Sequence, residues 1–378
     1  MMKGGRLQSI DALRGAAALA VVFYHVVGLK PEAATFAAMS RWRWLSLPFL
    51  HALSFGYTGV FLFFVISGFC IHLQWVRASV KGAETRIDFA AFWKRRLRRL
   101  YPPYLIALVL YLTISAWTSN VRFDSFYFWD VISHLLMLHN LDPRTVYSIN
   151  GVFWTLAIEE QLYLAYFLLL YLRRRWGWTR TLFICALARL LWLVVCEWLK
   201  NSRYGVEIPV TEAAATHWLT WALGALSVEA ALGMTKLPAW CSSLRVSLAA
   251  LLYAVALAYV LPHYDDRILI HHTLWLTLHP AWGLGFFVLV NRAVRAERTW
   301  SEAGRLPQGA ARLAVIGLFS YSLYLTHELV LMETWRVSSF PWLSSLPLPP
   351  LIFSLLIMTP LTVLAAWAFF LLCEQPFL

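Results

Sequence analysis

The chain has 378 residues, of which 60% are hydrophobic and only 14% are charged. A soluble domain carries about 25% charged residues, so the composition excludes an ordinary soluble protein and indicates a membrane protein. The formal net charge of +12 would suit a nucleic-acid-binding protein. However, cytoplasmic loops of membrane proteins collect Lys and Arg, which explains the basic excess more simply. The five cysteines show no CxxC or metal-ligand spacing, so neither a disulfide framework nor a metal site is expected.

The distribution of apolar residues predicts an all-α, polytopic fold with about ten transmembrane helices. A span needs about 20 largely apolar residues. The predicted spans are 10–29, 56–75, 100–118, 151–171, 181–199, 212–232, 244–262, 268–290, 313–333 and 350–372. The shorter amphipathic stretch 126–140 is predicted as an interfacial or re-entrant helix. Because no soluble domain or internal repeat is visible, residues 1–378 are predicted to form a single membrane-embedded domain.

The positions of the basic residues predict that both termini lie in the cytoplasm. With the N-terminus inside, 21 of the 32 Lys and Arg residues fall in cytoplasmic segments and 9 on the opposite side. The basic N-terminus could be mistaken for a signal peptide. The apolar run that follows contains Asp11, Arg14 and His25 and has no clear cleavage site, so we expect it to remain as the first span.

The first span contains three ionisable residues, each of which costs about 2.5–3.5 kcal/mol inside a bilayer and so needs a reason. Asp11 and Arg14 are spaced i,i+3, which predicts an ion pair. His25 lies eleven residues after Arg14, about three helical turns, so all three share one face. Small residues in 15–20 would let a helix or a ligand approach. The alternative is a topology anchor with an interfacial histidine; three aligned groups favour a function.

The fourth and ninth spans also carry ionisable residues. Glu159 and Glu160 are adjacent and lie about 12 Å into the bilayer, counted from Gly151. They would act in the site or, alternatively, form a buried ion pair with Arg189. In the ninth span, His327 is predicted at a depth similar to that of His25. The two histidines would then line one pocket, unless both are interfacial.

A run of five basic residues marks the cytoplasmic start of the third span. The planar guanidinium fork of Arg recognises phosphate, although the rule that basic residues face the cytoplasm would also explain the run. Its members are Lys94, Arg95, Arg96, Arg98 and Arg99. In the second span, Ser67 and the glycines between Gly59 and Phe69 would allow close helix packing or line a tunnel. His72 is expected to be structural.

Six stretches follow one another from residue 10 to 377: IDALRGAAALAVVFYH, GVFLFFVISGF, FWKRRLRRLYPPY, WTLAIEEQLYL, YSLYLTH and the terminal EQPF. In this order they resemble the acyltransferase-3 family of bacterial membrane proteins. The resemblance implies an O-acyltransferase acting on lipopolysaccharide O-antigen, exopolysaccharide or a similar glycan. By match, the residues associated with activity are Arg14, His25, Arg95, Arg96, Arg99 and Glu159. The chain departs from the family where serines or Trp are common, at Thr155, Ala157 and Thr326.

The residues and the resemblance together suggest a mechanism. The phosphates of cytoplasmic acyl-CoA, expected to be acetyl-CoA, would rest on Arg95, Arg96 and Arg99. Arg14 and Asp11 would lie at the mouth of a tunnel along the small-residue face of the first span. The thioester would reach His25, the general base, which Glu159 would orient. His327 would face the same site, and the acceptor hydroxyl would arrive from the extracytoplasmic side.

The rival class is a membrane transporter of a small solute or of an acyl or glycan species. Intramembrane His, Glu and Arg also mark transport pathways, but the inverted repeats that are common in transporters are not visible here. A purely structural membrane protein would not need aligned charges. The expected partners are acyl-CoA, a carbohydrate or glycolipid acceptor and the lipid bilayer, with no nucleic acid. The expected location is the bacterial inner membrane.

Overall fold

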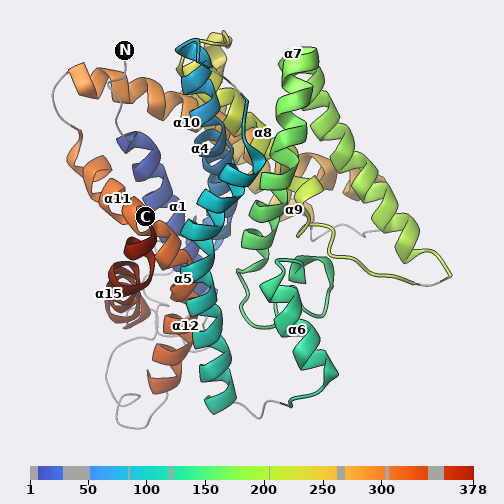
Figure 1. Cartoon of the computed structure of the whole chain (residues 1–378), viewed down its shortest axis with the longest axis vertical. Coiled ribbons are helices and arrows are strands. Elements are labelled where there is room, and N and C mark those ends of the chain that lie inside the picture. The colour runs from blue at the N-terminus through green and yellow to red at the C-terminus, as the bar shows by residue number, and fades with distance from the viewer. Residues whose placement is uncertain are drawn as a thin grey trace.

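The computed structural model describes residues 7–28, 52–83, 86–118, 122–203, 205–261, 269–302, 306–338 and 353–378. Within these ranges the regular secondary structure is entirely helical (Figure 1). The α-helices are α1 (Gln8–Gly28), α4 (Gly59–Val80), α5 (Phe89–Thr118), α6 (Ser125–Leu135), α7 (Trp154–Lys200), α8 (Ala214–Ala231), α9 (Leu244–Val260), α10 (Leu269–Glu302), α11 (Gln308–Leu318), α12 (Ser320–Ser338) and α15 (Thr359–Phe369). The short 3₁₀ segments are η2 (Phe55–Thr58), η3 (His139–Leu141), η4 (Ala239–Ser242) and η8 (Gln375–Phe377), and two π-helical segments, η6 (Ser354–Met358) and η7 (Phe370–Glu374), flank α15.

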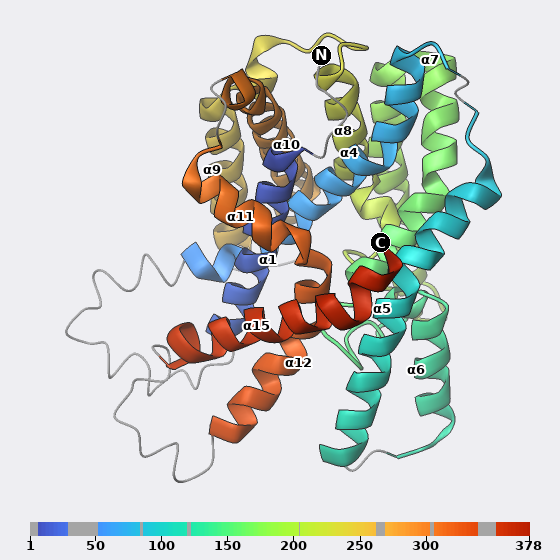
Figure 2. The ribbon, with the colours of Figure 1, turned by 60° about the vertical axis from the view of Figure 1, so that its left-hand side comes forward.

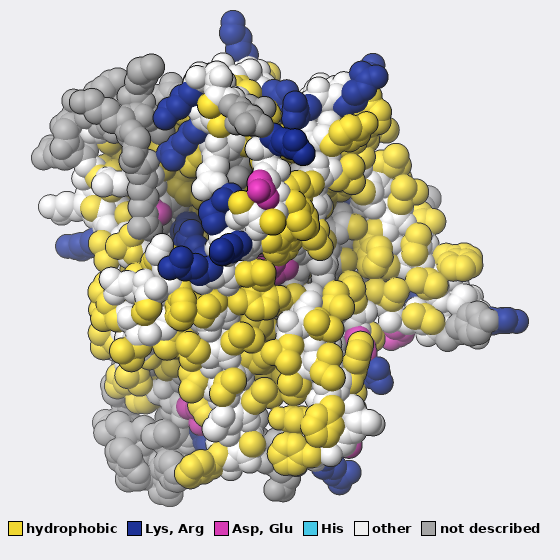
Figure 3. Space-filling view, in the orientation of Figure 1, with side chains coloured by type: hydrophobic (Ala, Val, Ile, Leu, Met, Phe, Trp, Pro, Cys, Tyr) yellow, Lys and Arg dark blue, Asp and Glu magenta, His cyan; other side chains and the backbone are white. Residues whose placement is uncertain are grey.

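A helix covers much or all of every predicted span, which confirms an all-helical membrane protein. Among the described residues, five helical segments are long and apolar enough to cross a membrane, or six if the bent pair α11–α12 counts as one. The count of ten and the cytoplasmic position of both termini therefore remain predictions. Lys and Arg side chains gather in the upper part of the face shown in Figure 3, and hydrophobic side chains cover most of the surface below them.

Four predicted spans differ in shape from simple membrane-crossing helices. The fourth and fifth join in α7, where the chain reverses at Gly177 with φ of 74°, a conformation that glycine adopts without a Cβ clash. The ninth is broken at Phe319 into α11 and α12, which meet at a bend of 74°. The tenth contains α15, which runs across the neighbouring helices in Figure 2 and is seen end-on in Figure 1.

The small residues of α1 serve helix packing. An ideal Cβ on Gly15 would lie 2.0 Å from the carbonyl oxygen of Leu313, and one on Gly317 would lie 1.9 Å from the carbonyl oxygen of Asp11. The backbones of α1 and α11 therefore touch. On another side, a Cβ on Gly59 would lie 2.6 Å from a carbonyl oxygen of α1. The prediction of a tunnel along this face was wrong, because neighbouring helices occupy the space.

Helices α4 and α8 form a second close pair in the centre of the protein. A Cβ on Gly68 would lie 2.0 Å from the carbonyl oxygen of Trp221, and a Cβ on Gly224 would lie 1.9 Å from that of Val65. These reciprocal contacts pin α4, which also packs against α1 and α10. Other residues of α4 line the cavity described below, together with α1, α5, α7 and α12.

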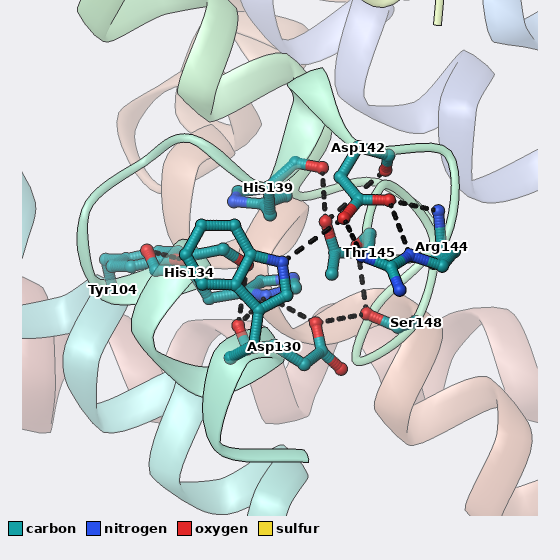
Figure 4. Close-up of polar contacts among 10 residues, drawn as sticks. Tyr104, Asp130, His134, His139, Asp142, Arg144, Thr145 and Ser148 are labelled. Carbon is teal, nitrogen blue, oxygen red and sulfur yellow. Dashed lines mark hydrogen bonds and ion pairs between the residues drawn. The ribbon is translucent and has the colours of Figure 1, made fainter. Parts of the chain in front are cut away.

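The predicted amphipathic helix near 126–140 is present as α6, and the loop after it leads to the start of α7. The rings of His134 and His139 stack with centroids 3.9 Å apart, and the Asp130 side chain accepts a hydrogen bond of 2.7 Å from Ser148 Oγ (Figure 4). Burial and the neighbouring His134 lower the pKa of His139 to about 3. Hydrogen bonds from Arg144 lower the pKa of Asp142 to about 2. The loop is thus held by a buried polar cluster.

Candidate active site

A cavity of about 120 Å³ lies between α1, α4, α5, α7, α12 and the C-terminal segment. Helix α4, which covers the predicted second span, contributes more lining residues than any other helix. The polar side chains that line it are those of Arg14, Ser67, Cys70, Arg96, Arg99, Thr155, Glu159, Tyr163, Ser320, Tyr321, Tyr324 and Glu374. The sequence-predicted residues Arg14, Arg96, Arg99 and Glu159 therefore share one cavity, although they come from three helices.

Three arginines concentrate positive charge in this cavity. Among the described residues, none of Arg14, Arg96 and Arg99 forms an ion pair. The Arg99 Nε is buried and has no hydrogen-bond partner within that part of the chain. Arg96 lies over the rings of Phe92 and Tyr163, at 5.5 and 5.7 Å. Partly buried guanidinium groups without ion-pair partners are suited to bind an anionic ligand.

The basic run divides into two faces of α5. Arg96 and Arg99 are spaced i,i+3, so they share a face and line the cavity. Arg95 lies about 100° around the helix from Arg96, is exposed and does not line the cavity. The expectation that Arg95 shares the phosphate site with them is therefore not supported by the geometry.

The predicted ion pair between Asp11 and Arg14 is absent from the described residues. Arg14 lines the cavity, whereas Asp11 is 5% exposed and lies where α1 touches α11. An i,i+3 spacing allows a pair but does not enforce it when each residue has a different surrounding. Asp11 therefore belongs to the helix contact and does not line the cavity mouth.

Glu374, in the C-terminal motif, is a site residue that the sequence interpretation did not single out. It is 2% exposed, lines the cavity and lies within electrostatic range of Arg14 and Arg99. One carboxylate oxygen accepts hydrogen bonds from Ser322 N (3.1 Å) and Ser322 Oγ (2.5 Å), in the first turn of α12. The sequence did contain a signal that could have identified Glu374: it is a charged residue that directly follows an apolar helix. Its carboxylate anchors the start of α12 beside the arginines.

The two predicted histidines meet, as their expected depths suggested. His327 Nε2 lies 3.3 Å from His25 Nδ1, and the ring centroids are 4.9 Å apart. His327 Nδ1 lies 2.8 Å from the carbonyl oxygen of Tyr324, which assigns the proton to Nδ1 and leaves Nε2 as an acceptor. His25 Nδ1 lies 2.9 Å from the carbonyl oxygen of Val21, which places its proton there too. The neutral His25 ring then carries its lone pair on Nε2, where a base needs it.

Glu159 and Glu160 do not contact the partners predicted for them, which were His25 for Glu159 and Arg189 for an ion pair. No hydrogen bond joins Glu159 to His25 among the described residues; Glu159 lines the cavity wall, and His327 is the side chain that contacts His25. Arg189 bonds to the carbonyl oxygen of Thr216 and lies 3.3 Å from His279, and among the described residues it forms no ion pair with either glutamate.

His72 is structural, as expected. It is 1% exposed, and its two ring nitrogens lie 3.1 Å from Tyr166 Oη and 3.0 Å from Glu229 Oε1. Arg173 also bonds to Glu229, through Nε at 2.6 Å. This network ties α4, α7 and α8 together outside the cavity.

Tyr324 connects the cavity wall with the histidines. Its ring lines the cavity, stands 5.7 Å from the ring of His327 and forms an edge contact with Phe63 at 5.8 Å. Its hydroxyl lies 2.7 Å from Thr155 Oγ1. Tyr324 therefore shares a cavity with the arginines and also contacts the imidazole pair.

The chain is similar to known acyltransferases. Residues 7–371 match the family model described as an acyltransferase domain. The O-acetyltransferase OatA of Staphylococcus aureus (strain NCTC 8325 / PS 47) is 30% identical over 216 residues, which are 52% of this chain and 31% of OatA. The peptidoglycan O-acetyltransferase OatA of Listeria monocytogenes is 29% identical over 180 residues, 44% of this chain and 24% of its own length.

Nodulation protein 10 of Rhizobium leguminosarum bv. viciae is 26% identical over 244 residues, 59% of this chain and 60% of that protein. The matched part thus spans about a third or less of the OatA proteins, and no solved structure matches the chain. The family model covers nearly the whole chain and agrees with the six sequence motifs. The chain therefore belongs to the acyltransferase-3 family of membrane enzymes.

Proposed function

We propose that this enzyme transfers an acetyl group from acetyl-CoA to a hydroxyl of a carbohydrate acceptor. The observation that carries the proposal is one cavity lined both by three arginines that form no ion pair among the described residues and by Tyr324, whose ring contacts His327 of the histidine pair. Acyl-CoA is a phosphate-rich molecule with a reactive thioester at the end of a long arm. The OatA relatives named as O-acetyltransferases support acetyl as the group and a glycan as the acceptor.

The arginine cluster supplies the donor site. The CoA phosphates would bind Arg14, Arg96 and Arg99, and the buried Nε of Arg99 has no other acceptor among the described residues. The pantetheine arm would follow the α4 wall of the cavity past Ser67 to Tyr324. This path replaces the one along α1, and it leaves Asp11 and Arg95 outside the donor site.

The histidine pair supplies the chemistry. His25 Nε2 would take the proton of the acceptor hydroxyl as its oxygen forms a bond to the thioester carbonyl carbon. The carbon–sulfur bond then breaks, and the imidazolium returns the proton to the CoA sulfur. His327 Nε2 lies 3.3 Å from His25 Nδ1, would share the Nδ1 proton with the carbonyl oxygen of Val21, and would stabilise the transient positive charge. Glu159 would balance the charge of the arginines from the facing wall.

The arrangement of the site suggests the sides from which the substrates arrive. The predicted topology places the arginines towards the cytoplasm, where acetyl-CoA is made, and the histidines towards the opposite face. CoA would not have to cross the membrane. We propose that the acceptor is a peptidoglycan, O-antigen, exopolysaccharide or similar glycan on the extracytoplasmic side of a bacterial inner membrane.

The experiment that tests the proposal uses the full chain, purified and returned to liposomes. Acetyl-CoA carrying a labelled acetyl group is supplied with envelope glycan prepared from the source cells. We expect release of CoA thiol together with label in alkali-labile glycan esters. A transporter would move label across the bilayer with the thioester intact, and that result would overturn the proposal.

A further inference from the structure

We infer that Glu328, which no role above uses, is a positioning residue that fixes the histidine pair against the start of α7. The inference rests on the proposed function, since it assigns Glu328 to the geometry of that same site. Glu328 directly follows His327 on α12. Its Oε2 accepts a hydrogen bond of 2.8 Å from Gly151 N, across 177 residues of sequence.

The turn before α7 leaves a backbone N–H group free to bind this carboxylate. Asn150 Oδ1 accepts from Val152 N (2.7 Å) and Phe153 N (3.1 Å), which caps the turn that begins the helix. The N–H of Gly151 then points to Glu328. A carboxylate at the N-terminal turn of a helix is favoured because the unpaired N–H groups there carry partial positive charge.

Gly151 allows a close approach of the carboxylate. An ideal Cβ at this position would lie 2.7 Å from Glu328 Oε1, closer than such atoms come in proteins. A side chain there would make the mobile end of Glu328 shift. The glycine and the glutamate therefore form one contact, with the helix start on one side and α12 on the other.

The same two helices meet a second time inside the cavity. Thr155 Oγ1 lies 2.7 Å from Tyr324 Oη, and that hydroxyl donates to the carbonyl oxygen of Val152 at 3.3 Å. Tyr324 and Glu328 lie one turn apart on α12, with His327 between them. The contacts on both sides fix the height and rotation of His327, and through it the ring of His25.

The contact predicts an effect on turnover that is separate from donor binding. Loss of the Gly151–Glu328 hydrogen bond would let the first turn of α7 and α12 slide relative to each other, while the arginines on α1 and α5 stay in place. A misplacement of about 1 Å in an active site can lower the rate about 100-fold. We therefore expect kcat to fall about 10- to 100-fold in E328A, with KM for acetyl-CoA within about twofold of wild type.

The test measures acetyl transfer in liposomes for E328A, E328Q, G151A and the control E333A. Glu333 lies on the same helix in a surface ion pair with Arg336 of 3.1 Å, so E333A should behave as wild type. E328Q keeps an acceptor oxygen and should retain at least a third of wild-type kcat with an unchanged pH profile. G151A keeps Glu328 but shifts its carboxylate, so it should lower kcat in the same direction as E328A by a smaller factor, and this can be measured even if E328A itself does not fold.

Three results would overturn the inference: normal kcat in both E328A and G151A, a loss in E328Q as large as in E328A, or a donor KM raised in step with the loss of kcat. The second would mean that Glu328 acts through its charge or proton. An inactive wild type would instead count against the proposed function, so the two failures can be told apart.

Discussion

Replacing Arg99 by Ala should weaken CoA binding about 10- to 100-fold, whereas replacing Arg95 should leave it within about twofold. The two residues lie four apart in the same basic run, but only Arg99 lines the cavity, and its Nε is buried without a partner among the described residues. A hydrogen bond between charged groups contributes about 1.5–3 kcal/mol, and each 1.4 kcal/mol is a factor of ten in affinity. Removal of like-charge repulsion from Arg14 and Arg96 offsets a small part of the loss.

The assay is calorimetric titration of CoA into detergent-purified R99A, R95A and wild type. At about 0.15 M salt the Debye length is about 8 Å, so a general attraction by the exposed run is largely screened, whereas a direct contact in the cavity persists. Equal losses in the two variants would mean that the run attracts CoA only as a surface charge. An unchanged dissociation constant in R99A would refute the donor site.

Three further predictions follow from other parts of the structure. H25A should abolish acetyl transfer while CoA binding stays within twofold in titrations; transfer near the wild-type rate would remove His25 as the base. G317A should lower stability by about 1–3 kcal/mol in detergent melts because its methyl group meets the backbone of α1, and G309A, with open space around it, should change stability by less than about 0.5 kcal/mol. A cysteine at Asp142 should react with an impermeant thiol reagent in intact cells, and one at Arg174 only after lysis; the reverse pattern would invert the predicted topology.

The helical membrane class and much of the site could be predicted because they depend on local patterns. Apolar stretches of about 20 residues mark helices whatever their neighbours. A charged or histidine residue inside such a stretch is costly, so it marks a function. This reasoning found Arg14, His25, Glu159 and His327, and equal depth was enough to predict that the histidines meet.

Side-chain partners could not be predicted in the same way, because they depend on which helices become neighbours. The spacing of Asp11 and Arg14 permits an ion pair, yet each residue lies against a different surrounding. Likewise, the sequence shows that the run of arginines is charged but not which helix face points into the cavity. Arg95 therefore could not be distinguished from Arg96. Glu374 was overlooked because its significance comes from Ser322, 52 residues away.

The misplaced tunnel has a physical explanation of the same kind. Glycine and alanine create potential space beside a helix, and either a ligand or another backbone can fill it. The carbonyl group of Leu313 occupies the space beside Gly15 in α1, and the carbonyl group of Trp221 occupies the space beside Gly68 in α4. Space remains where the wall is made of larger side chains that cannot interdigitate fully, as around Phe63 on the α4 face. In this fold, stripes of small residues therefore mark the places where two helices pack closely. The proposed ligand path lies beside these closely packed pairs.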